Sequence, residues 1–227
     1  MITLDRLSRE EALRYMGGAR AVPDERLNAL IDDCEAQILG GARPAFLYKI
    51  IALPDGRFTE GKDIAAHLEG CDRAVLLCAT LGAEIDKLIR VAQVSDMARA
   101  VVLDSLASAA VEQLCDKAER EIAERISGAY LTFRFSPGYG DYPIALQKRF
   151  LTELDAPRKI GLSANENHIL IPSKSVTAIA GISDRPVEQK KRGCAVCSMR
   201  ETCRYRKGGT HCGSADGRCS AERRSGF

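Results

Sequence analysis

One stretch in the second half of the chain has the residue types of a small-molecule binding loop. Residues 134–139 read RFSPGY and set an arginine and a tyrosine around a Pro137-Gly138 turn. Gly138 would let the backbone approach a ligand closely, Arg134 could bind a carboxylate through two parallel hydrogen bonds, and Tyr139 could stack or hydrogen-bond. The same residue types are typical of a polar turn whose arginine pairs with a nearby acid. The residues alone leave both interpretations open.

A second group of reactive side chains crowds the end of the chain, where five of the nine cysteines lie. Thiolates at such short spacing can close around one tetrahedral metal ion or an iron–sulfur cluster. The predicted ligands are Cys194, Cys197, Cys203 and Cys212, with His211 and Cys219 as alternatives. Only one Cys-x-x-Cys pair is present and the rest of the pattern is irregular, which favours an iron–sulfur cluster but leaves zinc open. Unligated or disulfide-forming thiols are the remaining interpretation.

The cysteine-rich segment is also strongly basic. Residues 185–227 hold 11 Lys or Arg and 4 Asp or Glu, whereas residues 1–184 hold 22 basic and 27 acidic side chains. This change predicts two domains, 1–184 and 185–227. The basic side chains could stabilise thiolates, or dock an acidic electron donor of the flavodoxin kind or a corrinoid protein. Nucleic-acid binding is not expected, because Tyr205 is the only aromatic residue interleaved with the basic ones.

The remaining cysteines, Cys34, Cys71, Cys78 and Cys115, stand singly in apolar or helical stretches and are expected to be buried. No apolar run reaches the roughly 18 residues that cross a bilayer. The first residues are charged from Asp5 onward and contain no apolar segment of a secretion signal. The sequence therefore predicts a cytoplasmic protein without a membrane partner.

The elements that must position these residues follow from hydrophobic periodicity. The clearest is an Ala-rich amphipathic helix over about 95–125. Further expected helices cover 8–17, 23–39, 63–68, 83–93 and 144–154. Expected strands cover 45–53, with a hairpin back through Arg57-Phe58, then 73–80, 129–135, part of 160–171, and 175–182. Because the late strands follow one another with few helices between them, the pattern predicts an α+β fold with a mainly antiparallel twisted sheet.

Three blocks of the sequence resemble the activation domain of cobalamin-dependent methionine synthase. Residues 134–139 resemble its S-adenosylmethionine-binding loop. Residues 104–112 resemble its long helix, in which an Asp is followed eight residues later by a ligand-facing Glu. Residues 161–177 resemble its strand-turn-strand, where an acid in the turn leads to a Pro and then to Ser-Val-Ser or Ser-Val-Thr. The blocks stand in the family's order, so the resemblance implies the family's fold over residues 1–184.

The resemblance also implies a set of ligand-binding residues. Arg134 would hold the methionyl carboxylate of S-adenosylmethionine, and Tyr139 and the backbone around Gly138 would line the pocket. Glu112 would face the amino or sulfonium group, although an exposed helix acid is the alternative interpretation of this residue. The full implied set is Arg134, Pro137, Gly138, Tyr139, Glu112, Glu166, Ser175 and Thr177. The loop departs from the family at residues 140–143, Gly-Asp-Tyr-Pro, where a Cys-Pro-Asp-His-like stretch is usual.

The corrinoid-binding module of the complete synthase has no counterpart in this sequence. His67 opens a His-x-x-Gly pattern, but Ala65 stands where the corrinoid signature has Asp, so His67 is expected at the surface or at a helix end. The resemblance therefore implies a reactivation subunit that acts in trans on a cobalamin-binding methionine synthase or another corrinoid protein, positioning the methyl donor for reductive methylation. The alternatives are an iron–sulfur electron-transfer protein that reduces corrinoid proteins and a zinc-stabilised interaction module.

Overall fold

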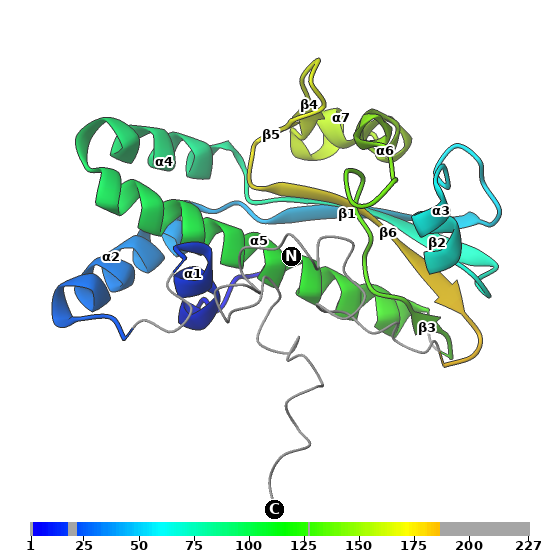
Figure 1. Cartoon of the computed structure of the whole chain (residues 1–227), viewed down its shortest axis with the longest axis horizontal. Helices are drawn as coiled ribbons and strands as arrows, with labels where there is room; N and C mark the ends of the chain where they lie inside the picture. The colour runs from blue at the N-terminus through cyan, green and yellow to red at the C-terminus, as the bar shows by residue number, and fades with distance from the viewer. Residues whose placement is uncertain (1, 18–21, 127, 187–227) are drawn as a thin grey trace, which may run out of the picture.

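The protein has an α+β fold in which a long helix crosses an antiparallel sheet (Figure 1). The computed structural model describes residues 2–17, 22–126 and 128–186. The cysteines predicted to bind metal, Cys194, Cys197, Cys203 and Cys212, lie outside these residues, as does nearly all of the predicted basic domain. Within the described part of the chain, no helix is long and apolar enough to cross a membrane.

Four antiparallel strands form the main sheet in the order β1-β2-β6-β3. Their bounds are Ala45–Ala52 for β1, Arg73–Thr80 for β2, Ser175–Ser183 for β6 and Tyr130–Leu131 for β3. β2 and β6 are central, and seven consecutive residues are buried in each. A strand that is buried on both faces needs apolar residues in a continuous run, which is the pattern of residues 73–80. The expected antiparallel sheet is confirmed.

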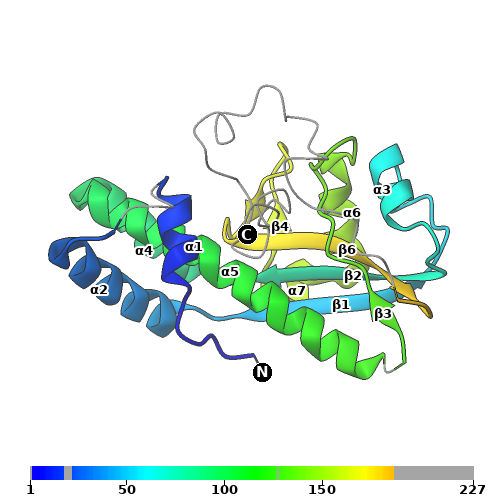
Figure 2. The ribbon, with the colours of Figure 1, turned by 60° about the horizontal axis from the view of Figure 1, so that its bottom comes forward.

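Four helices form one layer, in which α5 crosses a face of the sheet and the other three pack on α5 (Figure 2). They are α1 (Arg9–Tyr15), α2 (Glu25–Gly41), α4 (Ala83–Ser95) and the long α5 (Met97–Arg125). Each of three helices begins with a capping side chain: Ser8 for α1, Asp24 for α2 and Asp96 for α5. These side chains accept hydrogen bonds from backbone N–H groups of the first helical turn. Such N–H groups have no carbonyl partner within the helix, so the caps satisfy them. α5 confirms the helix expected over about 95–125.

The opposite face carries shorter elements (Figure 1). These are α3 (Lys62–His67), the 3-10 turn η1 (Ile144–Leu146), α6 (Gln147–Leu154), α7 (Ala156–Ile160) and a small hairpin of β4 (Ser163–Ala164) and β5 (Leu170–Ile171). Alternate residues of β2 divide between the two faces: Leu76 packs with α6, while Leu77 packs with α5 residues such as Ile122. The sheet thus separates two apolar cores.

Two local expectations are wrong, and a third, for His67, is only partly confirmed. The hairpin through Arg57-Phe58 does not form, because β1 pairs along its whole length with β2, and Phe58 is a buried core residue in a turn. His67 lies at the end of α3, one of the two places expected for it, but it is buried rather than at the surface, with Nε2 2.9 Å from the Phe133 carbonyl oxygen. Cys71 is only partly buried, whereas the other three single cysteines are buried as expected.

Candidate functional site

Arg134 lies at the centre of a cluster of acidic side chains on α5. Its Nη1 donates to Asp116 Oδ1 at 2.7 Å and to Glu119 Oε1 at 2.9 Å, and its Nη2 donates to Glu112. The three acids are spaced i, i+4 and i+7, so they share one face of the helix. Arg134 therefore pairs with nearby acids, and one of these, Glu112, is the residue that the resemblance placed on the ligand's cationic end.

The electrostatics of the cluster keep Arg134 charged. Its side chain is only 18% exposed, and this burial by itself lowers the pKa of the guanidinium. The negative charges of Glu119 and Glu112 outweigh the burial, so the pKa of Arg134 lies above its usual value. A guanidinium has five N–H donors, and the three acids use three of them. Donors therefore remain for an additional anionic partner.

A cavity of about 440 Å³ opens beside this cluster. Its walls come from α5, the chain that follows β3, α6, β5 and the start of β6. The residues that line it are Glu112, Phe133, Arg134, Phe135, Ser136, Tyr139, Gln147, Leu170, Ser175, Val176 and Thr177. The cavity is thus concave, partly aromatic and supplied with one cation and one anion, a composition suited to a zwitterionic ligand with an apolar or aromatic part.

Hydrogen bonds fix the wall that β6 contributes. Ser175 Oγ lies 2.8 Å from Thr80 Oγ1 and 2.7 Å from the Pro172 carbonyl oxygen. The buried Thr177 donates to Gln147 Oε1 at 3.1 Å, and Gln147 Nε2 donates to the His168 carbonyl at 2.6 Å. Gln147 therefore connects β6 with the β4–β5 turn, and this side of the cavity is held in one arrangement.

The loop that carries Tyr139 is held on both sides. Gly138 adopts a φ of 97°, and a Cβ there would lie 2.9 Å from Ile144 Cδ1, so the position requires glycine. Its N–H donates to the Tyr142 carbonyl at 2.8 Å. Tyr142 is buried and its hydroxyl donates to the Phe58 carbonyl. Residues 140–143, where the sequence departs from the resembled family, thus anchor the loop to the core.

The cavity brings together five of the eight residues that the resemblance implies. Glu112, Arg134, Tyr139, Ser175 and Thr177 line it, and the Tyr139 side chain is exposed at its edge. Pro137 is buried next to it and Gly138 shapes the loop, but neither is among the lining residues. Glu166 is exposed in the β4–β5 turn and does not line the cavity. Whether these eight residues bind a ligand stays a prediction.

Sequence reasoning missed several residues of this site. Asp116 and Glu119 complete the acidic cluster, and Gln147 with Phe133 completes the wall. The spacing of the two acids could have identified them. Asp116 follows Glu112 by four residues and Glu119 follows Asp116 by three, and residues at such spacings lie on one face of a helix. No local pattern marked Gln147, because its partners are 21 and 30 residues away in the chain.

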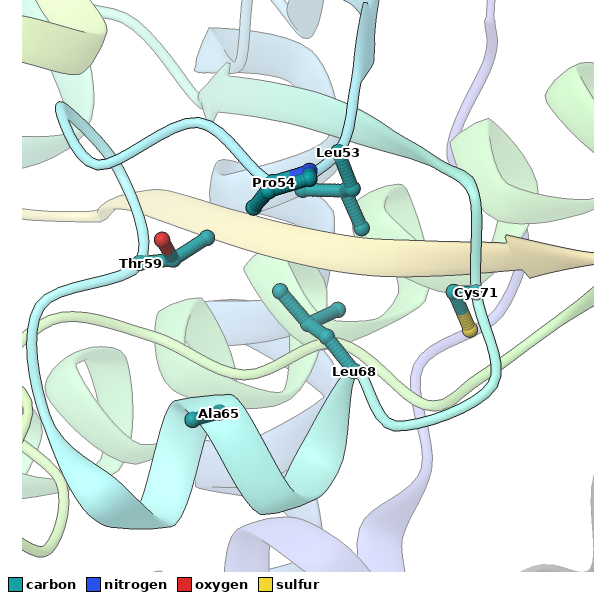
Figure 3. Close-up of a pocket in the computed structure, with 6 residues that line it drawn as sticks. All are labelled: Leu53, Pro54, Thr59, Ala65, Leu68 and Cys71. Atoms are coloured by element: carbon teal, nitrogen blue, oxygen red, sulfur yellow. The ribbon is translucent and has the colours of Figure 1, made fainter.

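A second, smaller cavity of about 230 Å³ lies between α3 and the chain that follows β1 (Figure 3). Its lining residues are Leu53, Pro54, Thr59, Ala65, Leu68 and Cys71. The lining holds no charged side chain, and burial raises the pKa of the Cys71 thiol. The lining of this cavity therefore contains neither an activated nucleophile nor a group that could bind a charged ligand. Among the described residues, no group of three or more His, Cys, Asp or Glu is placed to hold a metal ion.

Comparisons with known proteins support the fold. Neither the protein-family models nor the proteins of curated function contain a match to this sequence. Among solved structures, a crystal structure of the MetH reactivation domain bound to AdoHcy is similar, with a TM-score of 0.55 and 15% sequence identity. The similarity covers 79% of this chain and 75% of that chain. The expected fold, that of the methionine synthase activation domain, is therefore confirmed.

Proposed function

We propose that the cavity beside Arg134 binds S-adenosylmethionine and that the protein presents this methyl donor to a cobalamin-dependent methionine synthase or a related corrinoid protein. One observation carries the proposal. Five residues implied by the sequence resemblance line one cavity, on a fold shared with a reactivation domain whose structure holds AdoHcy. These residues come from three separate segments of the chain, so their meeting in one cavity is not a consequence of sequence proximity.

The residues present suit the ligand. Phe133, Phe135 and Tyr139 offer aromatic surfaces for an adenine ring. Arg134 keeps donors for a carboxylate, and Glu112 is an acceptor for an ammonium group. Glu112 and Arg134 pair with each other in the described state. We therefore expect the ligand to insert into this ion pair. Its carboxylate would replace Glu112 as the partner of Arg134, and its ammonium group would replace Arg134 as the partner of Glu112.

The protein's own contribution to methyl transfer would be orientation. Holding the carboxylate, the ammonium group and the adenine fixes the direction of the sulfonium methyl group toward the mouth of the cavity. Cobalamin would be supplied by a partner chain and would accept the methyl group after reduction by an external electron donor. The described residues around the cavity therefore need to supply neither a nucleophile nor a general base.

Titration calorimetry with S-adenosylmethionine tests this function. We expect binding by the wild-type chain, weakened by Arg134→Gln by about 2 kcal/mol, or about thirtyfold, as for the loss of a charged hydrogen-bonded partner. Because that substitution also removes three ion pairs, Tyr139→Ala is the companion variant: its side chain is 69% exposed, so folding should be unchanged while binding weakens. Arg57→Gln, an exposed arginine outside the cavity lining, is the control. Absence of wild-type binding, with or without a corrinoid partner, would refute the proposal.

The basic cysteine-rich segment extends this proposal. We propose that Cys194, Cys197, Cys203 and Cys212 bind an iron–sulfur cluster or zinc, and that the basic side chains around them contact the corrinoid protein or a flavodoxin-like electron donor. Anaerobic purification followed by iron, sulfide and zinc analysis distinguishes the two metals. Loss of the metal in a Cys194→Ser and Cys197→Ser double variant is expected, whereas a metal-free wild-type chain would contradict the proposal.

A further inference from the structure

Gln147 lines the cavity with a buried amide whose orientation is fixed. The residue begins α6 and is 7% exposed. Its amide bonds at 2.6 Å to the carbonyl oxygen of His168, which can only accept a hydrogen bond, so Nε2 must lie on that side. Oε1 then faces Thr177, whose hydroxyl donates to it at 3.1 Å. The amide therefore cannot exchange its two ends without losing the bond to His168.

These two bonds use half of the hydrogen-bonding capacity of the amide. A glutamine side chain has two N–H donors on its nitrogen and two acceptor lone pairs on its oxygen. The bonds to His168 and Thr177 take one of each, and the Gln147 side chain has no other hydrogen-bond partner among the residues that the structure describes. Because Gln147 lines the cavity, one donor and one acceptor remain for a bound ligand.

The cavity separates this amide from the charged residues of the site. The β6 wall comes from the start of that strand, whereas β3 pairs with its far end, so the cavity occupies the edge of the sheet. The helix α5, which carries Glu112, lies on one face of the sheet, and α6, which carries Gln147, lies on the other (Figure 2). A ligand whose charged groups contact Glu112 and Arg134 would therefore extend its other end toward Gln147.

The remaining donor and acceptor match one edge of an adenine ring. Adenine has a donating amino group at position 6 and an accepting ring nitrogen on either side of it, and glutamine amides pair with such an edge. A 6-oxo purine has a carbonyl oxygen at that position, so Oε1 of Gln147 would face a second acceptor. Because the His168 carbonyl prevents the amide from turning over, this mismatch is not relieved, and such a site rejects the oxo purine.

We propose that Gln147 selects adenine in this cavity, with Oε1 accepting from the 6-amino group and Nε2 donating to the neighbouring ring nitrogen. The inference rests on the proposed function, because it concerns the same cavity and ligand. It gives a specificity-determining role to a residue outside the set that the sequence resemblance implies. The aromatic side chains of the cavity would contact the faces of the ring, and Gln147 would contact its edge.

The test compares AdoHcy with its 6-oxo analogue, S-inosylhomocysteine, by titration calorimetry on the full chain. The two ligands share the carboxylate, the ammonium group, the thioether and the ribose, so the ratio of their dissociation constants isolates the purine edge. We expect the wild-type chain to prefer AdoHcy by about tenfold or more. Gln147→Met keeps the length of the side chain but removes the amide, and it should reduce this preference to less than about threefold.

Two further variants complete the design. Gln37→Met is the matched control, because Gln37 lies on α2, outside the cavity lining, where its amide donates to Asp33 at 2.9 Å. It should leave the ratio unchanged. Gln147→Asn keeps a polar amide but shortens the side chain by one methylene, so it should lower the preference as well, and it serves if Gln147→Met does not fold.

The outcomes separate this inference from the proposed function. Equal affinity of the wild-type chain for the two ligands would overturn the inference and leave the proposed function intact, and this result requires no variant. Equal weakening of both ligands in the Gln147 variants, with the ratio unchanged, would also overturn it, because it indicates a structural role only. Failure of the wild-type chain to bind either ligand refutes the proposed function itself.

Discussion

Asp63 and Asp141 each accept a hydrogen bond from the backbone N–H of the other. Asp63 N–H donates to Asp141 Oδ1 at 3.0 Å, and Asp141 N–H donates to Asp63 Oδ2 at 3.2 Å. Lys62 N–H adds a third bond to Asp141 Oδ2 at 2.7 Å. The pair joins the start of α3 to the loop that carries Tyr139, although 78 residues separate them in the chain. These hydrogen bonds thus hold the loop at the cavity mouth against α3, which packs in the core on the face of the sheet opposite α5.

The Asp141 carboxylate should make stability depend on acid pH. Its hydrogen bonds from Asp63 and Lys62 hold its pKa below the usual value. A carboxylate with a lowered pKa in the folded chain stabilises above its unfolded pKa of about 3.9, and this contribution is lost as pH falls through the folded pKa. Asp141→Asn should therefore flatten the acid limb of unfolding free energy against pH, measured by urea denaturation. The exposed Asp72→Asn is the control, and an unchanged acid limb for Asp141→Asn would count against this role.

Gly140 should not tolerate a side chain. It has a φ of 54°, and a Cβ there would fall on the Asp63 carboxylate. Gly140→Ala should therefore lower the free energy of unfolding by about 2 to 3 kcal/mol, combining left-handed strain with displacement of Asp63. Gly70→Ala is the matched control, because Gly70 has a φ of 79° but nothing within 4 Å of its Cβ position. It should cost about 1 to 2 kcal/mol. Equal losses for the two variants would show that the Asp63 contact contributes nothing.

Tyr142 should stabilise the loop through its hydroxyl as well as its ring. The side chain is buried, and the hydroxyl donates to the Phe58 carbonyl at 2.7 Å. Tyr142→Phe keeps the ring and leaves the buried carbonyl without this donor, so it should cost about 1 to 2 kcal/mol of unfolding free energy. Tyr130→Phe, at a half-exposed tyrosine of β3, should change stability by less than about 0.5 kcal/mol. A neutral Tyr142→Phe would mean that another group satisfies the carbonyl.

The elements that sequence predicts best are those with a strong internal period. α5 ends at Arg125 as expected and begins at Met97, within two residues of the prediction. Its apolar positions recur every three to four residues, and that period is independent of the rest of the chain. The hairpin after β1 failed for the opposite reason. A Pro-Asp-Gly turn signals a chain reversal, but the partner of β1 is decided by the apolar face of β2, which begins 21 residues after β1 ends.

The residues of the candidate site also fall into those that the sequence predicts and those that it does not. A resemblance in sequence selected Arg134, Glu112 and Thr177, and the cavity contains all three. Asp116 and Glu119 look like ordinary exposed acids of a helix, and only the position of Arg134 in space distinguishes them. The burial of His67 was not predicted, because its partners, Thr132 and Phe133, lie 65 and 66 residues further along the chain. Contacts between distant segments are set by packing, which no local pattern records.

Buried thiols give a prediction that is independent of any ligand. Burial raises the pKa of Cys34 to about 11 and that of Cys78 to about 12, and it also raises the pKa of the buried Cys115. At pH of about 8 the folded chain therefore holds almost no reactive thiolate at these positions. Brief alkylation followed by mass spectrometry should leave them unmodified, and urea should expose all three. Cys71, which is partly exposed, should react before them. Modification of Cys34 or Cys78 at the rate of an unfolded thiol would contradict the packing of both cores.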